Sequence, residues 1–117
     1  MIIDFHTHIF PNKIAEKTIR SLEEKANIKA SANGTLEGLL ASMERTGVDM
    51  SVIMPVATKP SQMESINAYA KEICDKYPGK LISFGGIHPD CEDYKGELNH
   101  IKELGLKGIK IHWFNTL

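Results

Sequence analysis

The sequence predicts an α/β domain in which four parallel strands alternate with amphipathic helices. Apolar runs typical of buried strands occur four times in the 117 residues, and segments of helical periodicity separate them. This spacing favours right-handed β–α crossovers, which build parallel sheets. A chain of this length can bury one modest core, so we expect a single domain over residues 1–117.

The first strand is expected over Ile2–His8, because an apolar run opens the chain and Pro11 follows it closely. Asn12 is expected to cap a first helix from Lys13 to about Lys25, whose apolar positions recur at helical spacing. Residues 26–34 are small and polar, which predicts a loop.

Thr35 is expected to cap a second helix that Gly47 ends in the left-handed conformation. The inward face of this helix is a stripe of four apolar side chains: Leu36, Leu39, Leu40 and Met43. Residues 50–56 form a nearly continuous apolar run, as expected of a strand that is covered on both faces.

The rest of the chain repeats this alternation. Ser61 and Glu64 have the spacing of a capping box, which predicts a third helix beginning there. Residues 81–87 are expected to form a third strand, residues 93–104 a fourth helix, and residues 106–113 a fourth strand.

Composition excludes several classes of partner. The formal net charge of −1 gives no basis for binding nucleic acid or an anionic membrane. No apolar run is long enough to cross a bilayer, and the first residues do not have the pattern of a secretion signal. Cys74 and Cys91 match no metal-ligand spacing, so we expect reduced thiols in a cytoplasmic protein.

Two histidines at the end of the first strand are the main candidate site. His6 and His8 are two residues apart, so on a strand their side chains share one face. Neutral imidazole is a common ligand of Zn²⁺ and related metals, and the carboxyl ends of strands are where active sites gather in parallel α/β folds. The pair is therefore predicted to bind a divalent metal.

Lys110 and His112 alternate with isoleucines in the fourth strand, so they share one face of it. If the isoleucines pack under helices, this face points inward, towards His6 and His8. A lysine inside a sheet costs several kcal/mol unless it is paired or neutralised. That cost is an argument for a role of Lys110, such as an anion contact or conversion to a metal-bridging carbamate. The alternative, which the sequence leaves equally open, is a side chain that reaches past the strand end to solvent.

Three further polar residues are weaker candidates for the site. His88 closes the third strand and is either part of the same mouth or a loop residue bonded to backbone. Asp4 is expected on the face of the histidine pair, where it either orients a ligand or pairs with Lys110. His100 falls on a helix and is expected to be solvated.

Three segments of the sequence carry a family resemblance: Ile3-Asp4-Phe5-His6-Thr7-His8, Ile87-His88-Pro89 and Gly108-Ile109-Lys110-Ile111-His112. They resemble the amidohydrolase superfamily, in particular its branch of TIM-barrel metal-dependent hydrolases that includes aminocarboxymuconate-semialdehyde decarboxylase-like enzymes. The resemblance implies a (β/α)₈ barrel with a divalent metal, usually zinc, held at the carboxyl mouth by His6 and His8. It also implies Lys110 and His112 as the candidate catalytic residues.

The resemblance covers the first half of such a barrel, since a full one needs about 250 residues. The expected fold is therefore a four-strand parallel half-barrel with flanking helices. The expected activity is metal-dependent hydrolysis of an amide, ester or related bond in a small-molecule substrate, or decarboxylation within the same family.

A second hypothesis is a half-barrel that self-associates without catalysis, because two open edges favour a homodimer. A flavodoxin-like binding module is a weaker alternative, since no phosphate-binding loop follows the first strand.

Overall fold

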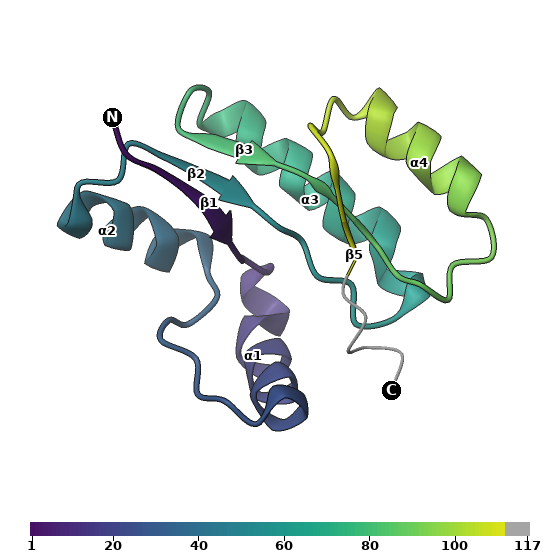
Figure 1. Cartoon of the computed structure of the whole chain (residues 1–117), viewed down its shortest axis with the longest axis horizontal. Coiled ribbons are helices and arrows are strands. Elements are labelled where there is room, and N and C mark those ends of the chain that lie inside the picture. Colours follow the sequence, from purple (N-terminus) through teal and green to yellow (C-terminus); the bar gives the residue numbers. More distant parts are fainter. Residues whose placement is uncertain (112–117) are drawn as a thin grey trace.

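The computed structural model of the protein describes residues 1–111, so His112 and the residues after it lie outside the described part of the chain. Strands and helices alternate along it in the expected order (Figure 1). The strands are β1 (Ile3–Thr7), β2 (Met50–Ile53), β3 (Leu81–Ser83), β4 (Gly85–Ile87) and β5 (Ile109–Ile111). The helices are α1 (Asn12–Ala26), α2 (Leu36–Thr46), the short 3₁₀ turn η1 (Pro60–Gln62), α3 (Met63–Lys76) and α4 (Tyr94–Glu103).

All the strand pairs in the described residues are parallel, which confirms the α/β class. The expected single sheet of four strands is wrong, however, because the strands form one sheet of order β1-β2-β3 and another of order β4-β5. The expected third strand over residues 81–87 is interrupted at Phe84, so that its first half pairs with β2 and its second half with β5.

The interruption coincides with the end of β2 and with a contact from α3. The last backbone bond between β2 and this segment joins the Phe84 N–H to the Ile53 carbonyl at 3.0 Å, and β2 ends there. Beyond that point the backbone of Gly86 bonds to the carboxamide of Asn67 in α3. A helix side chain therefore takes the position that a neighbouring strand would have held.

Helices α2 and α3 cover one face of the larger sheet. Its core joins Ile53 and Leu81 from the strands to Met43 from α2 and Ile73 from α3. The predicted stripe of α2 packs here as expected, with Met43 buried and three leucines partly buried: Leu36, Leu39 and Leu40. A second cluster joins α3, α4 and β4, and a third joins α1 to Phe10 and Val56.

The predicted ends of α2 are confirmed. The Thr35 hydroxyl accepts a hydrogen bond from the Gly38 N–H at 3.0 Å, which satisfies one of the unpaired donors at the helix start. Gly47 ends the helix with φ +74°, a left-handed conformation that glycine adopts without steric cost.

Two other predicted caps are wrong. Asn12 lies inside α1 and the cap position is Pro11, whose ring already fixes a backbone angle suited to helix entry. Ser61 does not cap α3, because Pro60 starts the 3₁₀ turn one residue earlier and Gln62 becomes the cap without a side-chain bond.

The two open edges of the sheets expose large apolar side chains. Phe5 on β1 is 61% exposed, and Ile3 beside it is exposed as well. The isoleucines of β5 at 109 and 111, which we expected to pack under helices, are also exposed, because no described helix covers them. Among residues 1–111, no helix is long and apolar enough to span a membrane.

Candidate functional site

The histidine pair lies where β1 ends. The rings of His6 and His8 meet edge to face, with centroids 4.9 Å apart and planes inclined at 73°. Thr7 between them is buried and donates its hydroxyl to the Val52 carbonyl at 2.8 Å. Because neighbouring side chains alternate along a strand, this anchor on one face directs both imidazoles to the other. The structure thus brings the two histidines together, as the sequence spacing predicts.

The His8 ring is oriented by the backbone of the next strand. Its Nδ1 lies 2.7 Å from the carbonyl oxygen of Met54, directly after β2. A carbonyl oxygen can only accept a hydrogen bond, so Nδ1 carries the proton in this contact. In the neutral ring Nε2 then holds the lone pair, and this is the tautomer in which backbone-bonded histidines bind metals.

Asp4 contacts the backbone of the site. Its Oδ1 accepts a hydrogen bond from the His6 N–H at 3.2 Å. The register between β1 and β2 shifts between Asp4 and Thr7. Asp4 nevertheless lines a second cavity together with His6 and His8.

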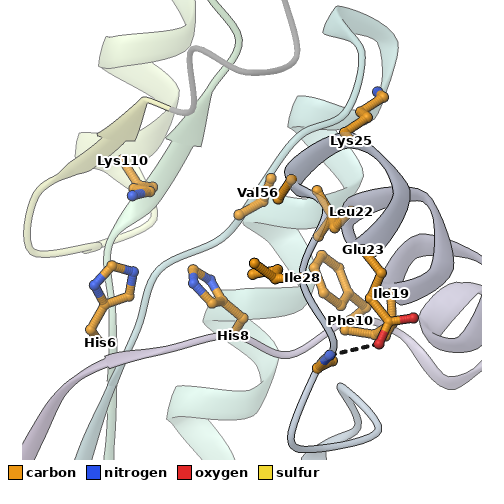
Figure 2. Close-up of a pocket in the computed structure, with 12 residues that line it drawn as sticks. His6, His8, Phe10, Ile19, Leu22, Glu23, Lys25, Ile28, Val56 and Lys110 are labelled. Atoms are coloured by element: carbon orange, nitrogen blue, oxygen red, sulfur yellow. Dashed lines mark hydrogen bonds between the residues drawn. The ribbon is translucent and has the colours of Figure 1, made fainter.

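Lys110 lies on the same side of a cavity as the histidine pair (Figure 2). It pairs with Gly86 in the β4–β5 ladder, and its side chain lines the same cavity of about 300 Å³ as His6 and His8. Figure 2 shows these three side chains on one side of the cavity, and apolar side chains together with Glu23 and Lys25 on the other. Three of the apolar residues are Phe10, Leu22 and Ile28, which come from the loop after β1, from α1 and from the loop after α1.

The remaining candidates lie elsewhere or outside the described residues. His112 falls among residues 112–117, so its position is not part of the described chain. His88 is 2% exposed, and its Nδ1 accepts a hydrogen bond from the Asp90 N–H at 3.1 Å. Among residues 1–111, its buried Nε2 has no hydrogen-bond partner. His100 lies 3.4 Å from Glu97 on α4.

Within residues 1–111, no group of three or more His, Cys, Asp and Glu side chains is placed to hold a metal ion. The imidazole pair is thus the donor set that the described chain provides, with the Lys110 amine on the same cavity. Sequence reasoning missed Ile28. The sequence did carry a signal, because Ile28 is an isolated isoleucine in a loop of small and polar residues. Such a loop offers no hydrophobic core in which the side chain could be buried.

Proteins similar to this chain are found among solved structures and not by comparison of sequences. No protein-family model matches the sequence, and no curated protein matches it. Among solved structures, the fold is similar to a 5-carboxyvanillate decarboxylase from Novosphingobium aromaticivorans, solved with bound manganese and 3-methoxy-4-hydroxy-5-nitrobenzoic acid. The TM-score is 0.69 at 18% identity, over 96% of this chain and 42% of the decarboxylase.

A second similar structure is the 4-oxalomesaconate hydratase from Rhodopseudomonas palustris. Its TM-score is 0.59 at 20% identity, over 93% of this chain and 40% of the hydratase. Both enzymes belong to the amidohydrolase superfamily. The chain therefore spans less than half the length of these two enzymes, and at such low identity the likeness establishes a shared fold.

Proposed function

We propose that this chain forms the metal-binding opening half of an amidohydrolase-type barrel, in which His6 and His8 ligate a divalent metal. The single observation that carries the proposal is the meeting of the two imidazoles, 4.9 Å apart at the carboxyl end of the first strand. The fold likeness to two amidohydrolase-superfamily enzymes, one of them solved with bound manganese, supports it.

The chemistry of the histidines fits a metal. The bond from Nδ1 of His8 to the Met54 carbonyl leaves Nε2 as the lone-pair donor of the ring and fixes its orientation. Two imidazoles suit Zn²⁺ as well as Mn²⁺ and Fe²⁺, and we propose Zn²⁺ as the first metal to test. A third ligand would come from Lys110 as a carbamate, from His112, or from another chain.

A divalent metal in this position would polarise a substrate carbonyl or lower the pKa of a coordinated water. The residues of the chain would do the rest. Where the third ligand comes from elsewhere and Lys110 remains an amine, it places an ammonium group on the same cavity and can bind an anionic oxygen of the substrate. The mainly apolar wall opposite offers a surface for a hydrophobic group of the substrate.

We propose hydrolysis of an amide, ester or related bond as the reaction. Decarboxylation is the second candidate, and one observation favours it: the fold is similar to that of a decarboxylase over 96% of this chain. Both reactions use a cation beside a carbonyl or carboxylate group. They differ in whether water attacks the substrate. The residues of the cavity wall, and side chains on the later strands of a full barrel, would decide between the two reactions.

Metal analysis tests the proposal. We expect protein purified without chelator to bind Zn²⁺ stoichiometrically, and His6→Ala or His8→Ala to weaken binding at least about tenfold, since loss of a ligand should exceed loss of an outer-shell contact. His100→Ala is the matched control, because it removes a helix histidine that pairs with Glu97. Metal content that is unchanged in both site variants would end the ligand assignment.

Self-association of a half-barrel is the alternative from a different class. The exposed Phe5 and Ile111 on opposite open edges favour it, since uncovered apolar strands at an edge are a liability for a monomer. A homodimer could pair these open edges with those of a second copy. Sedimentation velocity separates the cases: a monomer that binds no hydrophobic dye would exclude the dimer.

A further inference from the structure

The cavity beside the histidines has one polar end and one mainly apolar wall. His6, His8 and Lys110 form the polar end (Figure 2). The wall opposite is built mainly from apolar side chains, among them Phe10, Leu22 and Ile28, and Glu23 and Lys25 also line it. Its volume of about 300 Å³ lies at the small end of the range for ligand sites. An ammonium beside two imidazoles favours an anionic oxygen, and the wall favours a hydrophobic group attached to it.

Ile28 is the unusual member of this wall. It is 68% exposed, although isoleucine is among the residues most often buried. The segment from 27 to 34, which we call the strap, connects α1 to α2 and carries this side chain over the cavity. An exposed isoleucine at the rim of a cavity is apolar surface that a bound ligand can cover.

The strap is held at both ends. At its start, Asn27 adopts a left-handed conformation with φ 53°, and the Ile28 N–H bonds to the Glu23 carbonyl at 3.2 Å. The Glu23 carboxylate then accepts a hydrogen bond from the Ala30 N–H at 2.6 Å (Figure 2, dashed line). At its end, the Gly34 carbonyl accepts from the Phe10 N–H at 2.7 Å. Ile28 is thus fixed between two anchors.

We propose that Ile28 determines the size of the apolar group that this site accepts, and that Glu23 is the positioning residue that holds it there. The ligand is a small organic anion whose oxygens lie at the Lys110 end and whose single apolar group, about the size of one ring, contacts Ile28. This inference rests on the proposed function in locating the ligand at the same cavity, but it does not require a metal.

Nuclear magnetic resonance titration of the metal-free protein tests it, with acetate and benzoate as probes. We expect benzoate to shift the ring signals of His6 and His8 and the methyl signals of Ile28, and to bind about tenfold more tightly than acetate. Ile28→Ala should weaken benzoate binding about fivefold and leave acetate unchanged, because acetate does not reach the wall. Lys110→Met should weaken both.

Glu23 has its own variants. Glu23→Ala should reproduce the loss in Ile28→Ala, whereas Glu23→Gln keeps an oxygen acceptor for the Ala30 N–H and should retain benzoate affinity. Glu24→Ala, in the exposed residue next along α1, is the matched control and should have no effect. Circular dichroism checks that each variant is folded. We expect Ile28→Ala to fold, because the Ile28 side chain is exposed.

Three results would overturn the inference: no benzoate-induced shifts at the histidines and Ile28, equal losses of acetate and benzoate affinity in Ile28→Ala, or equal effects of Glu23→Ala and Glu24→Ala. The metal assignment is tested separately by the Zn²⁺ content of His6→Ala and His8→Ala. Failure of one proposal can therefore be distinguished from failure of the other.

Discussion

The carboxamide of Asn67 bonds to both backbone groups of Gly86. Its Oδ1 accepts from the Gly86 N–H at 2.7 Å, and its Nδ2 donates to the Gly86 carbonyl at 3.1 Å. The second Nδ2 proton goes to Glu97 at 2.8 Å, so every hydrogen of the fully buried amide is used. An amide offers the same donor and acceptor as a peptide unit, and α3 therefore replaces a strand at the edge of β4.

We predict that Asn67→Ala lowers the free energy of unfolding by about 3 kcal/mol, because it leaves both backbone groups of Gly86 buried without partners. Asn67→Asp should cost more, since a carboxylate cannot donate to the Gly86 carbonyl and would repel Glu97. Urea denaturation measures both. Asn99→Ala, at an exposed asparagine on α4, is the control and should change stability by less than about 0.5 kcal/mol.

The elements that sequence reasoning predicted correctly are those with local causes. Thr35 and Gly47 bound α2 through contacts within four residues, and the spacing of His6 and His8 determines their shared face. The division of the sheet at Phe84 depends on Asn67, seventeen residues earlier in sequence. A polar residue within a helical pattern gives no indication that its partner is a strand.

The same distinction explains which part of the candidate site was predictable. The period of two in the first strand identified the histidine pair from sequence alone. The apolar wall was not predicted, because the position of Ile28 depends on a bond between Glu23 and Ala30 across a loop. The chemistry of polar loops is visible in sequence, whereas the direction in which a loop folds back depends on contacts that sequence patterns do not encode.

We predict that the neutral His8 ring is the Nδ1–H tautomer, because its Nδ1 must donate to the Met54 carbonyl. Nitrogen-15 spectra of the imidazole side chains at about pH 9, where histidine is neutral, report the tautomer directly. Addition of Zn²⁺ should then shift the Nε2 signal and leave the Nδ1 proton in place. An Nε2–H tautomer in the metal-free protein would contradict the hydrogen bond and weaken the metal assignment with it.

We predict that Gly34→Ala destabilises the strap more than a left-handed backbone alone would cause. Gly34 has φ +73°, and an added Cβ would lie 2.9 Å from Ile19 Cγ1 and 3.2 Å from the Phe10 ring. Gly79→Ala is a matched control, with φ +75° and nothing within 4 Å of the added atom. We expect a loss of about 1 kcal/mol for the control and about 1 kcal/mol more for Gly34→Ala, measured by thermal unfolding. Equal losses would mean that Ile19 moves aside freely.

Cys74 should react slowly with alkylating agents. Burial, with a smaller contribution from the Asp75 carboxylate, raises the pKa of its thiol to about 11. Because the thiolate is the reactive form, iodoacetamide at about pH 8 should modify Cys74 on the order of a hundred times more slowly than an unperturbed thiol. Since the pKa is raised, the rate should increase about tenfold per pH unit up to about pH 11.

Mass spectrometry of the modified peptides gives the rates, and urea-unfolded protein is the control in which Cys74 regains ordinary reactivity. A rate that levels off near pH 8.5 in the folded protein would show that the thiol is solvated, and that the packing of Cys74 beside Ile73 and Leu81 is looser than described.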